Sequence, residues 1–416
     1  MRRYESYKDS GVDWLGEVPS HWELKRLKQL FVEKKHKQSL SLNCGAISFG
    51  KVIEKSDDKV TEATKRSYQE VLKGEFLINP LNLNYDLISL RIALSEIDVV
   101  VSAGYIVLKE KQIINKKYFS YLLHRYDVAY MKLLGSGVRQ TINYGHISDS
   151  ILVIPPLSEQ QKIAQFLDDK TAKIDQAVDL AEKQIALLKE HKQILIQNAV
   201  TRGLNPDVPL KDSGVEWIGQ VPEHWDVQRS KFIFKKIERK VNEEDQIVTC
   251  FRDGQVTLRA NRRTEGFTNA LKEHGYQGIR KGDLVIHAMD AFAGAIGISD
   301  SDGKATPVYS VCLPHDKQKI DVYFYAYYLR NLALSGFISS LAKGIRERST
   351  DFRYSDFAEL LLPIPPYLEQ QKIADYLDKQ TSKIDRAIAL KTAHIEKLKE
   401  YKSVLINDVV TGKVRV

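Results

Sequence analysis

Two copies of one stretch decide how this chain is organised. The first reads Ile154-Pro-Pro-Leu-Ser-Glu-Gln-Gln-Lys-Ile-Ala-Gln-Phe-Leu-Asp168, and the second reads Ile364-Pro-Pro-Tyr-Leu-Glu-Gln-Gln-Lys-Ile-Ala-Asp-Tyr-Leu-Asp378. The copies align without a gap at an offset of 210 residues, from Ile154 to Ile364. The match continues to Thr201 and Thr411. A gapless match of this length indicates an internal duplication in which each half ends in the same helix.

Each copy has the pattern of a long helix that begins after a proline pair. A residue before proline is pushed out of the α region, so Pro155-Pro156 and Pro365-Pro366 end whatever precedes them. Ser158-Glu-Gln-Gln161 fits a capping box, whereas Leu368 removes that box from the second copy. About thirty residues at about 1.5 Å each predict a helix roughly 45 Å long.

Apolar residues recur along both helices at alternating steps of four and three, which is the heptad pattern of a coiled-coil seam. Each seam has a lysine at the same place, and a polar seam residue fixes the register of a helix pair at some cost in stability. The simplest assembly is an antiparallel pair of the two copies. The predicted seam residues are Ile174, Val178, Ile185, Leu188, Lys192 and Leu195 in the first helix, and Ile384, Ile388, Ile395, Leu398, Lys402 and Leu405 in the second.

An arm that precedes each half is repeated as well. The first reads Lys8-Asp-Ser-Gly-Val-Asp-Trp-Leu-Gly-Glu-Val-Pro-Ser-His-Trp22, and the second reads Lys211-Asp-Ser-Gly-Val-Glu-Trp-Ile-Gly-Gln-Val-Pro-Glu-His-Trp225. The two arms hold all four tryptophans of the chain, and tryptophan buries a large apolar area. We therefore expect the tryptophans to anchor each arm on a folded domain, and we do not expect a metal or catalytic site here.

The segments between arm and helix differ in sequence, although both have a mixed α/β pattern. Short apolar runs predict strands at 76–78, 97–102 and 105–108, and at 283–287, 295–298 and 308–312. Gly74 and Gly282 stand before matching strands, which indicates a shared turn. Helices are expected near 118–134 and 322–341.

The sequence thus predicts the α+β fold class. We expect two mixed α/β domains separated by a pair of long antiparallel coiled-coil helices, with internal two-fold pseudosymmetry. The N-terminal arm and first domain are placed at 1–153, and the first helix at 154–203. The second arm and domain are placed at 204–363, and the second helix at 364–416.

Composition narrows the class of protein. A hydrophobic content of 43% and a mean hydropathy of −0.32 fit a globular chain with real cores. The net charge of +8 favours a polyanionic partner, although an ordinary basic protein has the same balance. Cys44, Cys250 and Cys312 lie far apart, which favours a reducing compartment. With no signal-peptide pattern at Met1 and no apolar run of about eighteen residues, we expect a cytoplasmic protein without a membrane partner.

Catalytic motifs are hard to find in this sequence. It has no GxxxxGK[ST] phosphate loop and no HExxH zinc pattern. The acidic groups at 56–58 and 300–302 fit surface turns, with a metal role as the alternative. We therefore expect no catalytic residue and no metal site in this chain.

Basic and amide side chains gather in both variable segments. Arginine, asparagine and glutamine pair bidentately with base edges, and lysine and arginine also bind phosphates without reading sequence. The alternative interpretation is a solvated basic face. The candidate DNA-binding residues are Lys65, Arg66, Tyr68, Arg139, Gln140, Asn143, Arg252, Arg259, Asn261, Arg262, Arg263, Arg346, Arg348 and Arg353.

Taken together, these motifs resemble the specificity subunit of type I restriction–modification systems. The resemblance covers essentially the whole chain. One departure, Arg202-Gly203 against Gly412-Lys413, touches only a helix end. The motifs that carry it are the helix starts at 154–168 and 364–378, the Lys-Ile-Asp segments at 173–175 and 383–385, the two arms, and the stretch at 282–297, which is similar to the target-recognition core of that family.

The resemblance implies a non-catalytic subunit whose two target-recognition domains each read one half of a bipartite double-stranded DNA site. It implies that the helices set the spacing of the half-sites and dock two methyltransferase (modification) subunits, which motor-nuclease (restriction) subunits join. S-adenosylmethionine for adenine-N6 methylation, and ATP and magnesium for cleavage, are then expected on the partner subunits and not on this chain.

Two other hypotheses remain open from the sequence. One is a coiled-coil protein-interaction scaffold with only nonspecific DNA binding, and the other is an enzyme that acts alone, such as a nuclease. Preference for one bipartite duplex at raised salt would exclude the scaffold, because nonspecific phosphate binding fades with salt. Absence of cleavage and methyl transfer by the isolated chain would exclude the nuclease.

Overall fold

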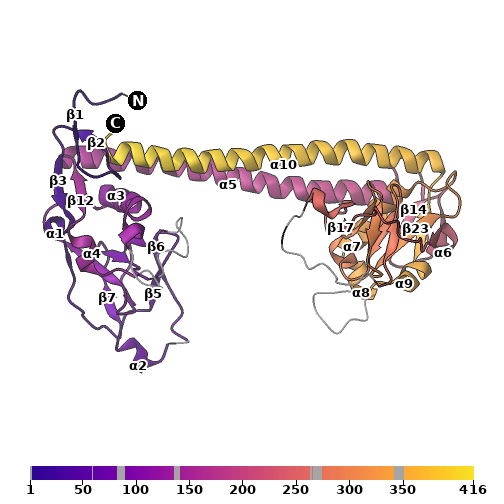
Figure 1. The fold of residues 1–416 in the computed structure, drawn as a ribbon, viewed down its shortest axis with the longest axis horizontal. Coiled ribbons are helices and arrows are strands. Elements are labelled where there is room, and N and C mark those ends of the chain that lie inside the picture. Colours follow the sequence, from indigo (N-terminus) through magenta and orange to yellow (C-terminus); the bar gives the residue numbers. More distant parts are fainter. Residues whose placement is uncertain are drawn as a thin grey trace. The chain divides into compact units, whose positions relative to one another are not determined.

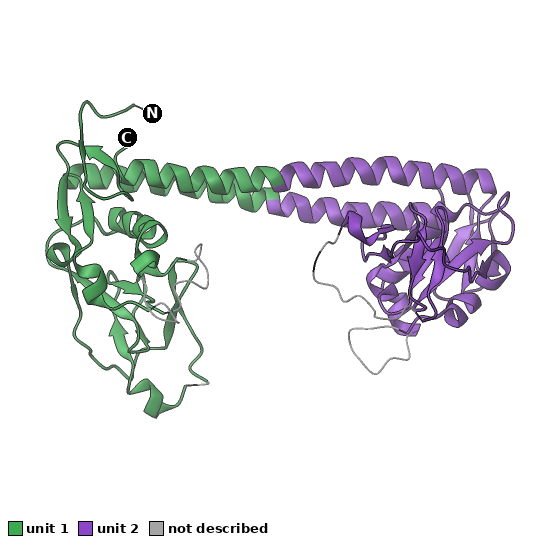
Figure 2. Ribbon diagram, in the orientation of Figure 1, with its two compact units in different colours: residues 1–181, 393–416 green, residues 182–392 purple. Residues whose placement is uncertain are grey.

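The structure is a computed structural model that describes residues 2–58, 60–81, 90–134, 141–262, 265, 274–341 and 351–416. The chain divides into two compact units (Figure 2). Unit 1 comprises Met1–Ala181 and Ala393–Val416, and unit 2 comprises Glu182–Thr392. The first long helix, α5 (Leu157–Arg202), begins in unit 1 and ends in unit 2, whereas α10 (Tyr367–Val410) begins in unit 2 and ends in unit 1.

Unit 1 contains an arm, short antiparallel sheets and one helix of fourteen residues, α3 (Figure 1). Its strands are β1 (Tyr7–Asp9), β2 (Glu17–Pro19), β3 (Glu23–Arg26), β4 (Phe31–Glu33), β5 (Gly45–Ser48), β6 (Lys51–Glu54), β7 (Gln69–Val71), β8 (Phe76–Ile78), β9 (Ile92–Leu94), β10 (Val99–Val101), β11 (Ile106–Glu110) and β12 (Ile151–Ile154). Its shorter helices are α1 (Leu27–Leu30), α2 (Glu62–Lys65), α3 (Lys116–Ala129), the 3-10 turn η1 (Met131–Leu134) and α4 (Tyr144–Ser148).

Unit 2 repeats this plan with its own sequence. Its strands are β13 (Leu210–Asp212), β14 (Gln220–Pro222), β15 (Asp226–Arg229), β16 (Phe234–Lys236), β17 (Val248–Cys250), β18 (Val256–Leu258), β19 (Gln277–Ile279), β20 (Leu284–His287), β21 (Ile296–Ile298), β22 (Gly303–Ala305), β23 (Tyr309–Pro314) and β24 (Leu361–Ile364). Its shorter helices are α6 (Ser230–Ile233), η2 (Arg259–Asn261), η3 (Ala291–Ala293), α7 (Val322–Leu334), α8 (Phe337–Leu341) and α9 (Tyr354–Glu359).

The largest sheet has the same strand order in both units. Unit 1 has four antiparallel strands in the order β4-β11-β8-β9, and unit 2 has β16-β23-β20-β21. In each unit, a separate two-stranded sheet pairs the strand that leads into the long helix with the strand after the arm: β12 with β3, and β24 with β15. The expected α+β fold class and the internal duplication are therefore confirmed.

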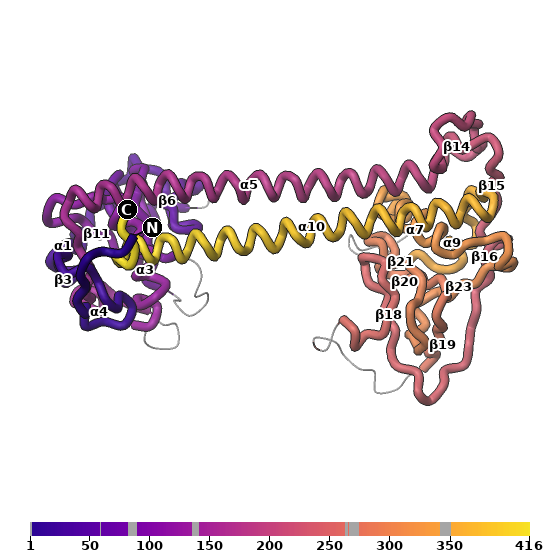
Figure 3. Tube along the Cα trace, turned by 90° about the horizontal axis from the view of Figure 1, so that it is seen from above, coloured from indigo at the N-terminus to yellow at the C-terminus, as the bar shows by residue number. Residues whose placement is uncertain are grey.

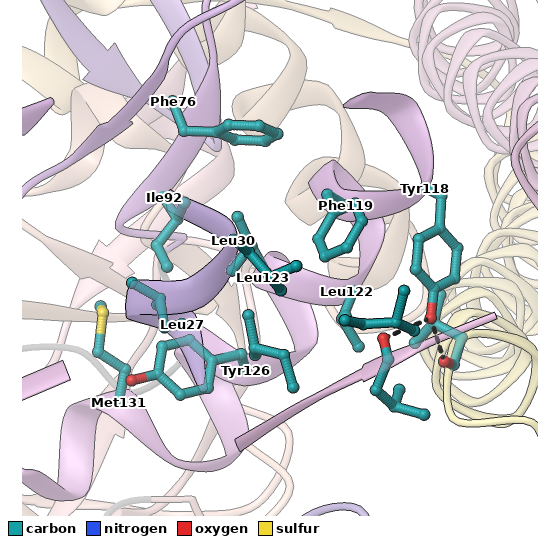
Figure 4. Packing of buried hydrophobic residues seen from close by; sticks show 14 of the residues in the cluster. Leu27, Leu30, Phe76, Ile92, Tyr118, Phe119, Leu122, Leu123, Tyr126 and Met131 are labelled. Carbon is teal, nitrogen blue, oxygen red and sulfur yellow. Dashed lines mark hydrogen bonds between the residues drawn. The ribbon is translucent and has the colours of Figure 1, made fainter. Parts of the chain in front are cut away.

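Aromatic and aliphatic side chains of α3 fill the core of unit 1 (Figure 4). Phe31 packs edge-on against Phe76 and Phe119, with ring centroids 5.4 and 5.6 Å apart. The buried hydroxyl of Tyr118 donates to the carbonyl of Val153, at 3.3 Å, or of Val410, at 3.1 Å. The core is therefore tied both to the strand before α5 and to the end of α10.

The long helices begin as the sequence predicts and extend further than it predicts. They span 46 and 44 residues, because the helix starts directly after each proline pair and also includes the turns that pack on the domains. The predicted capping box is wrong, since Ser158 lies inside the first turn. Pro156 instead accepts hydrogen bonds from the N–H groups of Glu159 and Gln160, at 2.8 and 3.0 Å. Pro366 does the same in the second copy, so both helices start alike.

The two helices pair antiparallel in each unit. In unit 2, Lys192 contacts Asp385 at 2.6 Å, and Lys391 donates to Gln184 at 2.6 Å, so the numbers rise along one helix and fall along the other. In unit 1, Lys402 makes the equivalent contact with Asp175 at 2.6 Å. All the predicted seam residues are buried or half-buried. Each seam lysine thus ends in an ion pair with the facing helix.

Each arm is anchored by a tryptophan, as expected. Trp22 and Trp225 are fully buried, and Trp14 nearly so. In unit 1, the chain ends meet, because Arg415 N–H donates to the Arg2 carbonyl at 2.9 Å. In unit 2, the arm that carries β14 lies beside the end of α5 (Figure 3). The end of one helix and the arm of the same unit therefore close each core.

The glutamate and the glutamine of the repeated motif each make matching contacts in the two units. The glutamate contacts the arm. Glu159 accepts hydrogen bonds from Trp22 Nε1 at 3.0 Å and contacts His21 at 2.8 Å, and Glu369 contacts His224 at 2.7 Å. Burial would raise the pKa of Glu159, but the hydrogen bonds from Trp22 and His21 outweigh it and lower that pKa.

The next residue of the motif, a glutamine, ties down the turn before the domain helix. Gln160 accepts from the Asn115 N–H at 2.9 Å and donates to the Pro155 carbonyl at 2.8 Å. Gln370 likewise accepts from Asp321 N–H and donates to the Pro365 carbonyl, at 2.8 and 2.7 Å. The repeated Glu-Gln pair therefore holds arm, loop and helix start together.

The six predicted strands are confirmed, and so is the shared turn, because Gly74 and Gly282 both have φ of +89°. The predicted single helices at 118–134 and 322–341 are wrong in one respect, since each is interrupted. α7 stops before Gly336, whose φ of +86° lies in the left-handed region that a side chain rarely adopts, and α8 follows. In unit 1, α3 ends at Ala129 and the 3-10 turn η1 follows.

Candidate nucleic-acid interface

A β-hairpin occupies the same place in each unit but presents different side chains. In unit 1, β5 and β6 are joined by Phe49-Gly50, and in unit 2, β17 and β18 are joined by the five residues from Phe251 to Gln255. The longer loop is closed by a hydrogen bond from the Phe251 N–H to the Gln255 carbonyl at 2.8 Å. Because the strands are paired alike, the difference between the units lies in these loops and the groups around them.

Two partly exposed arginines, Arg252 in the loop of the unit 2 hairpin and Arg262 shortly after β18, are called the arginine pair below. Arg252 reaches Asp290 at 2.7 Å and lies 5.8 Å from the centre of the Phe292 ring. Arg262 contacts both carboxylate oxygens of Asp253, at 2.9 and 2.7 Å. Its guanidinium lies 4.3 Å over the Phe251 ring.

This arrangement orients both guanidinium groups before any ligand arrives. A carboxylate fixes one edge of each group and an aromatic ring supports one face, so less rotational freedom is lost on binding. The side chain of Arg252 is 63% exposed and that of Arg262 is 35% exposed. A planar guanidinium of this kind can pair with O6 and N7 of guanine. The arginine pair is therefore the best placed of the described candidates for reading a base.

The other described candidates in unit 2 make internal contacts. Arg259 Nε donates to Thr249 Oγ1 at 3.4 Å, and Asn261 donates to Thr257 Oγ1 at 2.8 Å. Arg353 is the N-cap residue of α9 and contacts Asp351 at 2.8 Å. Its side chain is exposed, so a phosphate contact fits it better than a buried structural role.

In unit 1, the described candidates also divide into residues with internal contacts and residues that are exposed. Lys65 is largely buried against Asp57 at 2.6 Å, and this hydrogen bond lowers the pKa of Asp57 to about 2. Arg66, the C-cap residue of α2, is exposed beside Glu62, and Tyr68 is half-buried. Asn143 caps α4, because its side chain accepts from the His146 N–H at 3.1 Å. Of these, Arg66 is the one best placed to meet a phosphate.

Five further candidates lie outside the described residues, and nothing follows for them: Arg139, Gln140, Arg263, Arg346 and Arg348. The sequence did not single out Asp253 or Asp290, which hold the arginine pair. Asp290 is 38 positions from Arg252 in the chain, so no local pattern links them. Phe49 was missed as well, because a two-residue hairpin turn is expected from pairs such as Asn-Gly and not from Phe-Gly.

A sequence model for the type I restriction modification DNA specificity domain matches this chain twice, at residues 19–189 and 222–400. This chain belongs to that family. It is a DNA-sequence-specificity subunit with two tandem specificity domains. The first match includes the β5–β6 hairpin, and the second includes the β17–β18 hairpin and the arginine pair.

Relatives of this specificity subunit agree with the family. It is 24% identical, over 456 aligned residues, to the candidate specificity subunit of the type I restriction enzyme MjaX of Methanocaldococcus jannaschii, covering 99% of this chain and 97% of that one. It is 23% identical over 296 residues to the EcoBI specificity subunit of Escherichia coli, covering 64% of this chain and 61% of that one.

Two solved structures share the fold of this specificity subunit. One comes from a study of complex assembly and conformational transition in the type I R-M system, with a TM-score of 0.68, 14% identity, and coverage of 95% of this chain and 99% of that one. The other is the HsdS subunit from Thermoanaerobacter tengcongensis, with a TM-score of 0.55, 16% identity, and coverage of 98% and 100%.

The described residues lack two other kinds of feature. Within that part of the chain, no three His, Cys, Asp or Glu side chains are grouped so as to hold a metal ion. Among the same residues, no helix has both the length and the apolar content needed to cross a membrane.

Proposed function

We propose that this specificity subunit reads a bipartite DNA site, with one half-site for the domain of each unit. The observation that carries the proposal is that the two units share one strand order but have different side chains on their hairpins. A frame that repeats while its exposed loops differ suits two dissimilar half-sites, because base readout depends on the few side chains that reach the groove. In this proposal the arginine pair contacts bases in one half-site, and Arg66 and Arg353 contact phosphates.

The second part of the proposal is that α5 and α10 set the distance between half-sites. A helix of 46 residues is about 69 Å long. This is the length of about two turns of DNA, because one turn is about 34–36 Å. The ion pairs of Lys192 and Lys402 resist sliding of one helix along the other, because a shift would separate each lysine from its aspartate. A fixed register is what a spacer needs.

The third part is that the outer faces of these helices dock two modification subunits. Leu180, Leu187 and Ile194 follow one another at seven-residue steps on α5 and are exposed. On α10, the exposed residues Leu390 and Val404 are separated by two such steps. Positions seven residues apart return to the same helix face. The exposed stripe on α5, with Leu390 and Val404 on α10, is suited to packing against helices of a partner.

The catalytic steps then belong to those partners. We propose that the modification subunits hold S-adenosylmethionine and methylate adenine, and that restriction subunits supply ATP- and magnesium-dependent cleavage. The specificity subunit contributes the choice of site and the placement of both modification subunits on it. It works with these subunits in the cytoplasm.

The test is to express the chain with its modification subunit and to map methylated adenines in a genome. The expected result is one bipartite motif with two unlike halves and a fixed gap. Exchange of residues 204–363 for the matching segment of another specificity subunit should change one half alone. Duplex binding that shows no preference at raised salt would instead support the scaffold alternative.

A second experiment tests the spacer. Removal of Leu180–Ala186 and of Leu390–Glu396 takes one heptad from each helix and keeps both lysine–aspartate pairs. Each helix shortens by about 10 Å, so the gap should shrink by about three base pairs at about 3.4 Å each, with the bases unchanged. The matched control removes one of the two segments and should disturb helix pairing. A change in the recognised bases would show that the helices are not the spacer.

A further inference from the structure

The tip of the β5–β6 hairpin carries an aromatic ring that the fold does not use. Phe49 is 95% exposed, whereas most phenylalanines of the described residues lie in the cores. Its backbone has a φ of +47°, and it is the one non-glycine residue of the described chain with a positive φ. Neither burial nor backbone preference explains a phenylalanine at this position.

The loop itself favours a different residue. Ser48 pairs with Lys51, so Phe49 and Gly50 form a two-residue connection, and both have positive φ. That is the type I′ turn, which strongly favours Asn-Gly because asparagine tolerates the left-handed region. A phenylalanine there is strained, and strained residues in exposed loops point to function.

The hairpin is firmly held, so the ring stands on a fixed base. A Cβ atom on Gly50 would come within 2.5 Å of Leu90, which shows how closely the turn packs on its own domain. The Cys44 N–H donates to Asp57 at 2.8 Å behind the strands. A rigid support allows an exposed ring to enter a ligand without first losing much freedom.

We propose that Phe49 is a wedge that inserts between stacked bases of the half-site read by unit 1. Apolar side chains such as phenylalanine act in this way in proteins that unstack and kink DNA. The hairpin lies in a DNA specificity domain, and the exposed Lys51 beside the ring is suited to a phosphate. A single ring is far smaller than the area that a stable protein interface buries, about 800 Å² on each partner.

The wedge belongs to one half-site only. In unit 2, the phenylalanine at the start of the matching loop, Phe251, is covered by Arg262 at 4.3 Å. That hairpin presents guanidinium groups in place of an apolar ring. The two units would thus recognise DNA by different means, deformation in one half-site and direct hydrogen bonding in the other. This inference rests on the proposed reading of one half-site by each unit.

The experiment compares Phe49→Asn with Phe49→Trp in the full chain bound to its modification subunits. Asparagine suits the turn and removes the ring, and tryptophan keeps an aromatic wedge. Duplexes carry the mapped site, with 2-aminopurine at successive positions of each half-site to report unstacking. The control variant is Ile113→Asn, which removes another highly exposed apolar side chain, 86% exposed, outside the hairpin.

Phe49→Asn should weaken cognate binding roughly tenfold, the value of about one base–aromatic stack. The 2-aminopurine signal should vanish in one half-site alone, while the melting temperature stays equal or rises. The salt dependence of binding should not change, because no charge is lost. Phe49→Trp should retain affinity and signal, and Ile113→Asn should match the natural chain.

Equal unstacking by Phe49→Asn and the natural chain would overturn the wedge. So would a loss of modification-subunit binding with DNA contact unchanged, because the ring would then face a protein. A natural chain that shows no preference for the mapped site would instead refute the proposed function, so the two failures are distinguishable.

Discussion

The β5–β6 hairpin of unit 1 and the β17–β18 hairpin of unit 2 are matching elements with different side chains at their tips. Their strand pairing matches, but one tip carries the exposed ring of Phe49 and the other carries the arginine pair. By contrast, Gln160 and Gln370 make the same hydrogen bonds in both units. The matching glutamines hold the fold in both units, whereas the side chains at the two hairpin tips differ and are exposed at Phe49 and Arg252.

The largest effect should come from the shared anchors. Trp22→Ala and Trp225→Ala each remove a fully buried indole, and such a change costs about 3–5 kcal/mol of the free energy of unfolding. Each variant should lose hydrogen-exchange protection in its own unit first. Equal loss in both units would mean that the units fold as one body and would break the comparison.

Two conservative substitutions, Trp22→Phe and Trp225→Phe, make this test more specific. Trp22 Nε1 donates to Glu159 at 3.0 Å, whereas Trp225 Nε1 has no hydrogen-bond partner among the described residues. Trp22→Phe should therefore cost about 1–2 kcal/mol more than Trp225→Phe, because it alone loses a bond to a charged group. Urea denaturation measures the difference, and equal costs would show that this bond adds no net stability.

A pH effect should distinguish the units next. Burial raises the pKa of Asp127 to about 6, although the Arg91 and Ile92 N–H groups donate to it. The matching position in unit 2, counted from Tyr121 to Tyr327, is Ala333. The folded pKa lies above the unfolded value of about 3.9. The folded state therefore binds this proton more tightly, and stability falls as pH rises from about 4 to about 6.

This loss should amount to about 2–3 kcal/mol and then remain constant above about pH 6. Asp127→Asn keeps an acceptor for both N–H groups and removes the ionisation. Urea denaturation at a series of pH values should show the difference between variant and natural chain changing over that window. A difference that is constant from pH 4 to pH 7 would contradict the prediction.

Loss of either residue of the arginine pair should change the free energy of DNA binding by an amount similar to, or smaller than, this change in the free energy of unfolding. Arg252→Ala or Arg262→Ala should weaken cognate binding by about 1–3 kcal/mol and relax one base position. Binding to random duplex should change little. Lys319→Ala is the control, because it removes one exposed charge elsewhere in unit 2. An equal loss on cognate and random duplexes would show that the arginines contact phosphates alone.

The smallest effect should come from the seam ion pairs. Asp385→Ala and Asp175→Ala each remove an exposed partner of a seam lysine. Exposed pairs of this kind contribute about 0.2–1 kcal/mol, and the two variants should be alike. Thermal unfolding at about 0.1 and about 1 M salt measures them, because salt screens such pairs. Unequal losses would show that the helix pair is not symmetric in energy.

The sequence predicted those parts of the fold that depend on repetition and periodicity. The duplication, the seam and six strands follow from patterns of neighbouring residues, and the tryptophan anchors follow from size and apolarity. It failed where a single backbone position decided the outcome. Ser158 looked like a cap but lies inside the helix, because Pro156 already supplies the acceptor. Gly336 looked like part of a helix but ends one.

For the candidate interface, the sequence identified the basic residues but could not predict which of them are exposed. Lys65 and Arg66 are adjacent in sequence, yet Lys65 is largely covered where it contacts Asp57, and Arg66 is exposed. Which side chain reaches solvent depends on partners brought from elsewhere in the chain. That information is absent from any local stretch.

The sequence by itself determined that this protein has two halves built on one plan, with a heptad seam on each long helix, because repeats and periods are written in the order of the residues. Only the tertiary structure decided which groups remain available for DNA. Folding places Asp290 against Arg252, Glu159 against Trp22, and nothing over Phe49 among the described residues. Availability is a property of three-dimensional neighbours, since each contact that stabilises the fold removes a side chain from the surface that can bind.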